Sequence, residues 1–249
     1  MPLLSNIMRS LFISMLLLFL VENISFAQET LKIPDASSEY DLVVEVEACG
    51  GEKQNNNANN CSGMAQISIY RKSTKFPSQI LDLRNVEVYK DTISHNPKIN
   101  TKPRMLYEEE YSFVFDDFNF DSNEDLAICN GRNGGYGGPS YNVYLFNKQS
   151  NKFIENKRLS RLTEGVYLGL FFVDSKRKQL VTFSKSGCCY HETEKYELAN
   201  NRPFLVEKII EEASGSDDVG YDAVVTTRKL IKGKWVKRVR KEKIKEGNP

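Results

Sequence analysis

Short stretches in which apolar and polar residues alternate, separated by turn-forming residues, recur along most of this chain. Period-two alternation is typical of half-buried strands, and clusters of Gly, Asn, Asp and Pro between such stretches are typical of turns. The expected strands are 40–47, 63–71, 79–89, 111–115, 126–129, 141–146, 152–154, 168–173, 179–184, 194–198, 204–209, 223–231 and 234–239. Helical turns are expected only near 159–164 or 206–213. Many short strands at close spacing predict an all-β fold of the sandwich, barrel or propeller type.

The N-terminus has the pattern of a secretory signal peptide. Arg9 precedes an apolar run over 11–21, and Ser25-Phe26-Ala27 places small residues where signal peptidase cleaves. The run is short for a membrane span, although an uncleaved anchor is the alternative. We therefore expect residues 1–27 to be removed. Residues 28–249 are expected to form a single all-β domain in the periplasm, without stable membrane insertion.

Two of the five cysteines, Cys49 and Cys61, bracket a stretch rich in asparagine. An exported protein meets an oxidising compartment, where cysteines pair if the geometry allows. A bond between these two would close a loop and stabilise the fold by about 3 kcal/mol in the chain-entropy model. A Cys49–Cys61 disulfide is therefore predicted.

The other three cysteines, Cys129, Cys188 and Cys189, leave one thiol over however they pair. A bond between the adjacent Cys188 and Cys189 is one possibility. A zinc site completed by His95 and His191 is another interpretation, but neighbouring cysteines do not have tetrahedral ligand spacing. A catalytic cysteine with His191 as its base is a third. The residues alone leave these interpretations open.

Charge is nearly balanced over the whole chain, with a formal net charge of +1. This balance argues against a general nucleic-acid-binding protein. Residues 229–245 are locally basic, but apolar residues alternate with the cations. We interpret this segment as a β-hairpin with a solvated cationic face, with a nucleic-acid surface as the alternative.

Residues 117–125 form an acidic loop with the spacing of a calcium site. Oxygen-bearing side chains stand at positions one, three and five, a carbonyl is expected at position seven, and a further carboxylate stands at nine. The predicted ligands of one structural Ca²⁺ are Asp117, Asn119, Asp121, Asn123 and Asp125. The two phenylalanines that alternate with them, Phe118 and Phe120, are expected to point into the core.

This loop departs from the helix-loop-helix calcium pattern at two positions. Ser122 stands at position six, where glycine eases the turn, and Ile128 stands at position twelve in place of glutamate. We therefore expect a weak site flanked by strands. An acidic turn that binds no metal is the alternative.

A glycine-rich segment, 130–139, follows the acidic loop. It lacks the lysine of a phosphate-binding loop. A binding loop and a simple connector packed against neighbouring strands are both compatible with this composition.

Three stretches of the chain resemble a family of bacterial periplasmic proteins. They are Asp117-Phe118-Asn119-Phe120-Asp121 with Glu124-Asp125-Leu126, the run from Gly137 to Phe146, and the run from Phe183 to His191. Characterised members of that family are immunity proteins that inhibit lysozyme-like effectors of interbacterial secretion systems. The resemblance covers about 107–249, whereas 28–106 matches only in strand and cysteine character. It implies a propeller-like β fold with one bound calcium.

The run Ser186-Gly187-Cys188-Cys189-Tyr190 also resembles the Ser-Gly-x-x-Tyr pattern of bacterial lysozyme inhibitors with other folds. In those proteins the loop enters the enzyme's cleft and meets its catalytic carboxylates. Ser186 and Tyr190 can donate hydrogen bonds to carboxylates, and Lys185 or His191 can add a complementary charge. The alternative is an ordinary hairpin turn with a buried tyrosine.

These observations favour a periplasmic inhibitor or immunity protein of a lysozyme-like, peptidoglycan-degrading enzyme. The second hypothesis is an extracytoplasmic, calcium-stabilised β domain that binds glycan or another envelope component without inhibiting an enzyme. A hydrolase is the third, with carboxylates at Asp116, Asp117 and 108–110. Two suitably spaced catalytic acids cannot be assigned among them, so we do not expect an enzyme.

Overall fold

The computed structural model describes residues 29–49, 60–90, 111–217 and 220–244. Its strands form three antiparallel sheets, in each of which neighbours in sequence are neighbours in space. The N-terminal sheet contains β1 (Glu29–Ile33), β2 (Tyr40–Cys49), β3 (Asn60–Arg71) and β4 (Gln79–Tyr89). The middle sheet contains β5 (Phe113–Asp116), β6 (Asp125–Gly131), β7 (Ser140–Asn147) and β8 (Lys152–Glu155). The C-terminal sheet contains β9 (Phe172–Asp174), β10 (Gln179–Ser186), β11 (Tyr190–Ala199), β12 (Arg202–Asp217), β13 (Gly220–Ile231) and β14 (Lys234–Ile244).

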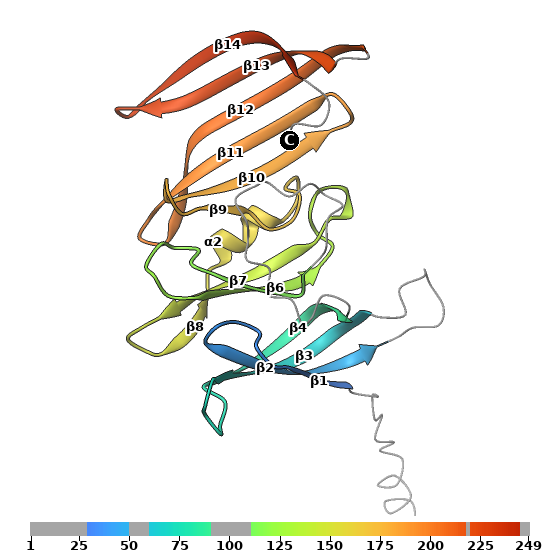
Figure 1. Cartoon of the computed structure of the whole chain (residues 1–249), viewed down its shortest axis with the longest axis vertical. Helices are drawn as coiled ribbons and strands as arrows, with labels where there is room; N and C mark the ends of the chain where they lie inside the picture. The colour runs from blue at the N-terminus through green and yellow to red at the C-terminus, as the bar shows by residue number, and fades with distance from the viewer. Residues whose placement is uncertain (1–28, 50–59, 91–110, 218–219, 245–249) are drawn as a thin grey trace, which may run out of the picture.

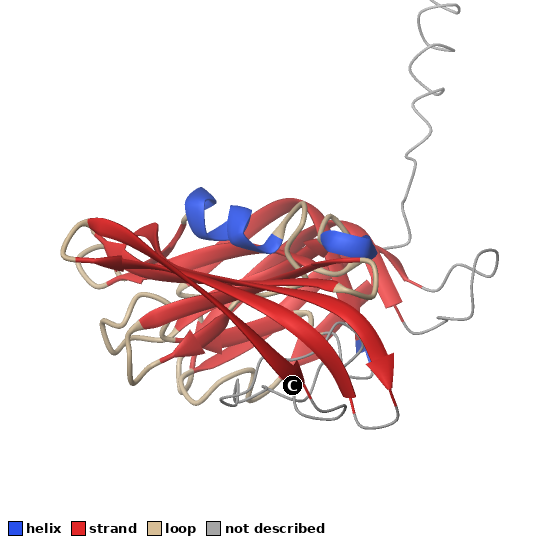
Figure 2. Cartoon of the chain, turned by 90° about the horizontal axis from the view of Figure 1, so that it is seen from above, coloured by secondary structure: helices blue, strands red, loops and turns tan. Residues whose placement is uncertain are grey.

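The three sheets are stacked in the order of the sequence (Figure 1). Seen from above, their strands overlie one another, and short helical segments lie at the margin of the stack (Figure 2). These segments include α2 (Lys157–Ser160), η3 (Arg161–Thr163) and η2 (Gly135–Gly137). No helix in the described ranges is long and apolar enough to cross a membrane.

The middle sheet is buried on both faces, which explains its nearly continuous apolar strands. On β6, Leu126 and Ile128 face the N-terminal sheet, whereas Ala127 and Cys129 face the C-terminal sheet. Successive side chains of a strand point to opposite faces, so each strand of the middle sheet contributes to two separate cores. The acidic loop, which joins β5 to β6, is therefore anchored between two packed layers.

The predicted all-β class is confirmed, and each sheet is an antiparallel meander of four or six strands. Almost every expected strand is present, and the expected turn near 159–164 is confirmed as α2 and η3. The alternative helical turn at 206–213 is wrong, because those residues lie within β12. There the backbone pairs with both β11 and β13, and this tertiary pairing outweighs local helical tendency.

Several predictions concern residues outside the described ranges. They include the signal peptide over 1–27, His95 and the carboxylates at 108–110. The division into a leader and one mature domain stays a prediction.

Candidate functional site

The acidic loop between β5 and β6 is closed by its own side chains. The Asp117 carboxylate accepts hydrogen bonds from the backbone N–H of Asp121 at 2.9 Å and of Ser122 at 2.8 Å. Asn119 Oδ1 accepts from Asp121 N at 3.2 Å, and Asp121 Oδ1 accepts from Asn123 N at 2.9 Å. Such side-chain-to-backbone bonds are how Asp and Asn fix tight turns. The four predicted ligands Asp117 to Asn123 are thus gathered in one compact turn.

Asp125, the fifth predicted ligand, has a different role. Its side chain is 0% exposed. Oδ2 accepts from the backbone N–H of Phe118 at 2.9 Å and of Asn119 at 3.3 Å, and Oδ1 accepts from Phe146 N at 2.8 Å. The carboxylate therefore fastens the start of the loop to β7. Burial raises the pKa of Asp125 to about 8, and the nearby carboxylates of the loop add to this effect, while the backbone N–H groups oppose it.

The residue types of the loop fit a hard cation, because carboxylate and amide oxygens are calcium's preferred ligands. Asp117 and Asn119 are half-buried and Asp121 is exposed, so their oxygens remain reachable from solvent. Their geometry is that of a self-bonded turn, however. In the described part of the chain, the one group of three His, Cys, Asp or Glu ligand atoms that converges within 4.8 Å is Glu29 with Cys49 and Cys61. Those two cysteines form a disulfide, so that group is not a metal site.

Ser122 takes the backbone conformation that glycine takes in calcium loops. Its φ is 68°, in the left-handed region that costs a residue with a Cβ roughly 1 kcal/mol. Replacing Ser122 with glycine is therefore expected to raise the free energy of unfolding by about 1 kcal/mol. Urea denaturation of the two proteins measures this difference. A stability equal to or below that of the parent would mean that another interaction of Ser122 compensates for the strain.

The aromatic residues of the loop lie where the alternation predicts. Phe118 is completely buried and meets Phe171 edge-on, with ring centroids 5.4 Å apart. Phe120 is partly buried against the same core. Glu124, which the sequence pattern left without a partner, accepts hydrogen bonds from Ser37 Oγ at 2.6 Å and Ser38 Oγ at 2.8 Å. The loop is thus tied to both neighbouring layers, as expected of a scaffold element.

The β10–β11 hairpin carries the second predicted site. Lys185 pairs with His191 and Ser186 pairs with Tyr190 across the hairpin, and Gly187 adopts a φ of 67° at its tip. Residues 186–189 are exposed, whereas Lys185, Tyr190 and His191 are partly buried at the base. The four predicted contact residues are therefore brought together at one end of the C-terminal sheet.

The predicted Cys49–Cys61 disulfide is confirmed, and of the three cysteines whose pairing the sequence left open, the two adjacent ones are bonded. Cys49 and Cys61 are bonded and lie opposite each other on β2 and β3. Cys188 and Cys189 are bonded to each other at the hairpin tip. Cys129 is a buried thiol on β6, with Tyr89 Oη and the Gly131 carbonyl as its neighbours. The single bond between Cys188 and Cys189 removes the adjacent thiols that the zinc alternative and the catalytic-cysteine alternative need.

The glycine-rich segment supports this hairpin, a contact that the sequence did not predict. Gly135 N donates to the carbonyl of Tyr167 at 2.7 Å, and a Cβ at position 135 would lie 2.6 Å from the Val166 carbonyl oxygen. Only glycine permits this approach. The packed loop holds Tyr136 so that its hydroxyl accepts a hydrogen bond from Gly187 N at 2.6 Å, and Lys185 Nζ lies 5.1 Å from its ring centroid.

Tyr136 is 62% exposed and therefore belongs to the same accessible surface as the hairpin tip. We call Tyr136, Lys185 and residues 186–189 the tip surface. Its tyrosine comes from a segment about fifty residues earlier in the chain. The glycine density of 130–139 was the available signal for it, because repeated glycines mark close backbone approach.

A chain of hydrogen bonds fixes the base of the hairpin from the inner side of the sheet. Tyr190 Oη donates to Glu192 at 2.9 Å, and Lys208 Nζ bridges Glu192 at 2.6 Å and Glu194 at 3.1 Å. Burial raises the pKa of Glu194, but hydrogen bonds from Tyr196, Lys208 and Tyr167 outweigh burial and hold the pKa below its ordinary value. Tyr190 is thus oriented by an ionised network and does not point freely into solvent.

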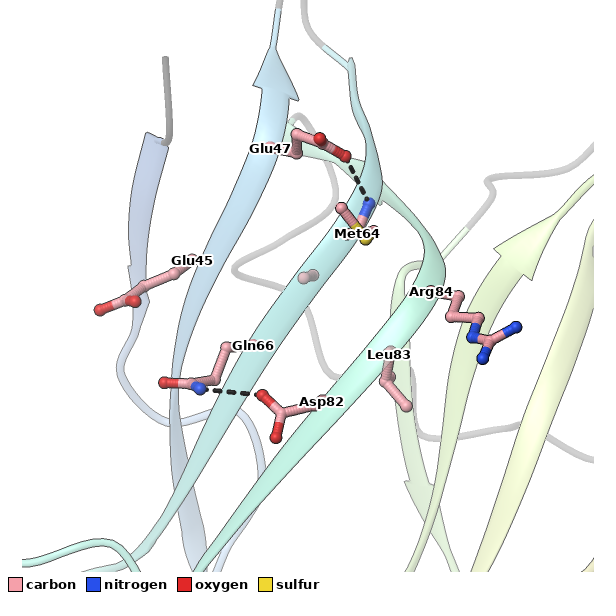
Figure 3. A pocket seen from close by; sticks show the side chains of 8 residues that line it. Glu45, Glu47, Met64, Gln66, Asp82, Leu83 and Arg84 are labelled. Atoms are coloured by element: carbon pink, nitrogen blue, oxygen red, sulfur yellow. Dashed lines mark hydrogen bonds between the residues drawn. The ribbon is translucent and has the colours of Figure 1, made fainter. Parts of the chain in front are cut away.

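A shallow cleft of about 550 Å³ lies on the N-terminal sheet, at the other end of the stack (Figure 3). Gln66 Nε2 donates to Asp82 there at 2.8 Å, and the Met64 backbone N–H donates to Glu47 at 3.2 Å. Figure 3 shows Arg84 pointing away from the carboxylates of Asp82 and Glu47. The cleft contains no converging set of groups comparable to the tip surface.

The chain is similar in fold to a solved Xanthomonas type IV secretion system related protein. The TM-score is 0.62, and the sequences are 22% identical over 88% of this chain and 96% of that chain. At this identity the likeness concerns the fold alone. No protein-family model matches the chain, and no curated protein matches it.

Proposed function

We propose that this protein is an exported envelope protein associated with a secretion system, and that it binds and blocks a lysozyme-like glycosidase. In this proposal it acts in the periplasm by inserting the tip surface into the enzyme's cleft, and it is not an enzyme itself. The structural neighbour is described as secretion-system related, which supports the general setting. The two disulfides suit an oxidising compartment.

The observation that carries the proposal is the exposed but rigid hairpin tip. A bond between adjacent cysteines restricts the backbone of residues 188 and 189, and Tyr136 holds Gly187 from the side. A loop that is already ordered loses less entropy when it docks, so more of its contact energy appears as affinity. An exposed loop that is already ordered is suited to docking into an enzyme's cleft.

The chemistry of the tip surface is complementary to a glycosidase cleft. Such enzymes commonly hold two carboxyl groups at the scissile bond. The Ser186 hydroxyl can donate to one of them, and the Lys185 ammonium, which now lies over the Tyr136 ring, can supply positive charge. Tyr190 and His191 flank the tip, with the Tyr190 hydroxyl set by Glu192. Within this proposal, Tyr190 positions the loop as well as contacting the enzyme.

The test is inhibition of purified lysozymes of several families by the mature protein, with release of soluble peptidoglycan fragments as the readout. Near-stoichiometric inhibition of at least one enzyme is expected. Replacing both Ser186 and Tyr190 with alanine is expected to raise the inhibition constant at least about 30-fold, since contacts at the centre of an interface contribute about 2 kcal/mol or more.

A matched control removes a serine and a tyrosine from the outer face of β3, through Ser68→Ala with Tyr70→Ala. Both residues are partly buried, like Tyr190, but lie on another sheet. The control is expected to inhibit like the parent. Inhibition that survives in the Ser186 and Tyr190 variant would exclude the tip surface as the contact, and fragment release by the protein alone would overturn its role as an inhibitor.

We further propose that one calcium ion stabilises the acidic loop through Asp117, Asn119, Asp121 and Asn123, with Asp125 as the internal clamp. A weak extracellular site has a dissociation constant of roughly 10⁻⁴ M. Calcium at about 100 times that value would add ~2.7 kcal/mol, which raises the unfolding midpoint by roughly 5–10 °C. Thermal unfolding in excess calcium and in chelator measures this shift.

Asp117→Asn with Asp121→Asn is expected to abolish the calcium-dependent shift. Glu124→Gln is the control, because Glu124 contacts Ser37 and Ser38 and is outside the proposed ligand set. It is expected to keep the full shift. Equal midpoints of the parent protein with calcium and with chelator would mean that the loop is an acidic turn and binds no calcium.

A further inference from the structure

Three cations stand side by side across the outer strands of the C-terminal sheet. Lys208 on β12 lies directly opposite Arg228 on β13, and Arg228 lies directly opposite Lys237 on β14. Residues in direct register point to the same face of a sheet. Like charges at such positions destabilise the sheet, so this arrangement needs a compensating feature.

Only the inner end of this row is neutralised by the protein itself. Lys208 is bound to Glu192 and Glu194, at 2.6 Å and 3.1 Å. Arg228 and Lys237 are exposed, and neither forms an ion pair with a carboxylate within the described ranges. Two adjacent positive charges therefore remain available on one side of the sheet.

An aromatic wall borders these charges. Trp235 lies two residues before Lys237 on β14 and therefore on the same face of the strand. It pairs with Leu230 on β13. A recess of about 480 Å³ lies here, lined by Leu205, Lys208, Arg228, Trp235 and Lys237. Trp235 is 50% exposed, so part of its apolar indole ring is accessible beside the cations. A mostly apolar recess with a few convergent charges is the usual composition of a small-ligand site.

We propose that this recess binds a carboxylate-bearing saccharide. The apolar face of a sugar ring would pack on the indole of Trp235, and the sugar's carboxylate would be held by Arg228 and Lys237. Arginine binds carboxylates in a bidentate manner, and the second cation adds to the attraction. The setting rests on the proposed function: in a cell envelope, such a saccharide is wall glycan whose muramic-acid carboxyl carries no peptide.

Other anions match the recess less well. A nucleic acid needs a longer track with several stacking rings, whereas this recess is lined by three cations, one of them already paired, and one aromatic ring, in a chain of net charge +1. A second copy of the chain is disfavoured, because the exposed face of β14 would meet its own positive charge. The site does not depend on the proposed inhibition, since its residues lie outside the tip surface.

The chain offers an intrinsic probe, because Trp235 is its one tryptophan. The mature protein is titrated with a tetrasaccharide of alternating N-acetylglucosamine and N-acetylmuramic acid, and tryptophan fluorescence is followed. A saturable change is expected. The neutral tetramer of N-acetylglucosamine and a short poly-glutamate peptide are each expected to bind at least tenfold more weakly. Equal or tighter binding of either would overturn the proposal, in favour of a neutral sugar site or an acidic protein partner.

Arg228→Gln with Lys237→Gln is expected to weaken binding of the acidic tetrasaccharide at least tenfold. The matched control is Lys234→Gln with Arg238→Gln, which removes the same charge from the opposite face of β14. The control is expected to bind within about twofold of the parent. Folding of each variant is verified by its unfolding midpoint, and fluorescence changes that are identical in the two double variants would mean that binding depends on net charge and not on this recess.

Discussion

Replacement of Asp125 with alanine is expected to lower the free energy of unfolding by about 3 kcal/mol or more. The side chain is fully buried and accepts hydrogen bonds from the backbone N–H groups of Phe118, Asn119 and Phe146. Alanine would leave these donors without an acceptor, and each buried unsatisfied donor costs about 1–3 kcal/mol. It would also release the loop from β7. Urea unfolding in the presence of chelator measures the loss without any contribution from calcium.

A neighbouring substitution separates this clamp from the general acidity of the loop. Asp121→Ala removes an exposed carboxylate whose contacts lie within the turn. In chelator it is expected to cost less than about 1 kcal/mol, as is common for surface positions. Asp125→Asn, which keeps one acceptor oxygen, is expected to fall between the two. If Asp121→Ala and Asp125→Ala cost the same, Asp125 would not have the structural role that its hydrogen bonds indicate.

Removal of the Cys49–Cys61 disulfide is the second change with a large expected effect. The bond joins two strands and closes a loop of sequence separation 12. The chain-entropy model gives a loss of about 3 kcal/mol when such a cross-link is removed. Replacing both cysteines with alanine is therefore expected to lower the unfolding midpoint markedly, as followed by circular dichroism.

The second disulfide provides the control. Cys188 and Cys189 are adjacent in sequence, so their bond closes no chain loop and restricts only the hairpin tip. Their replacement with alanine is expected to change global stability by less than about 1 kcal/mol. A comparable loss of stability in both double variants would contradict the view that the first disulfide acts on the fold and the second on the tip.

The fold class could be predicted from the sequence because period-two alternation depends only on which side chains are buried. The alternation pattern failed to identify a strand where neither face of that strand is continuously apolar. At 206–213, Glu207 and Lys208 interrupt the pattern, and the carboxylates and cations of neighbouring strands pair with them. The strand β1 was also missed, although Leu31 and Ile33 alternate with polar residues along it.

In the two candidate sites, the sequence predicted the contacts between residues close in sequence, but not the contacts between residues far apart in sequence. Local spacing was sufficient to gather Asp117 to Asn123 in one turn and Lys185 to His191 in one hairpin. It could not reveal that Asp125 is a buried acceptor that joins the loop to β7, because its donors include Phe146, 21 residues away. It could not place Tyr136 against Gly187 either, because that contact spans 51 residues.

The central claim is that the tip surface contacts a lysozyme-like enzyme. Amide hydrogen exchange of the mature protein, alone and in complex with the lysozyme that it inhibits most strongly, tests the claim directly. The proposal predicts new protection at residues 135–137 and 185–191, and unchanged exchange over β2 to β4 and over the β13–β14 hairpin. Protection confined to the outer face of the N-terminal sheet, with residues 185–191 exchanging as in the free protein, would contradict it.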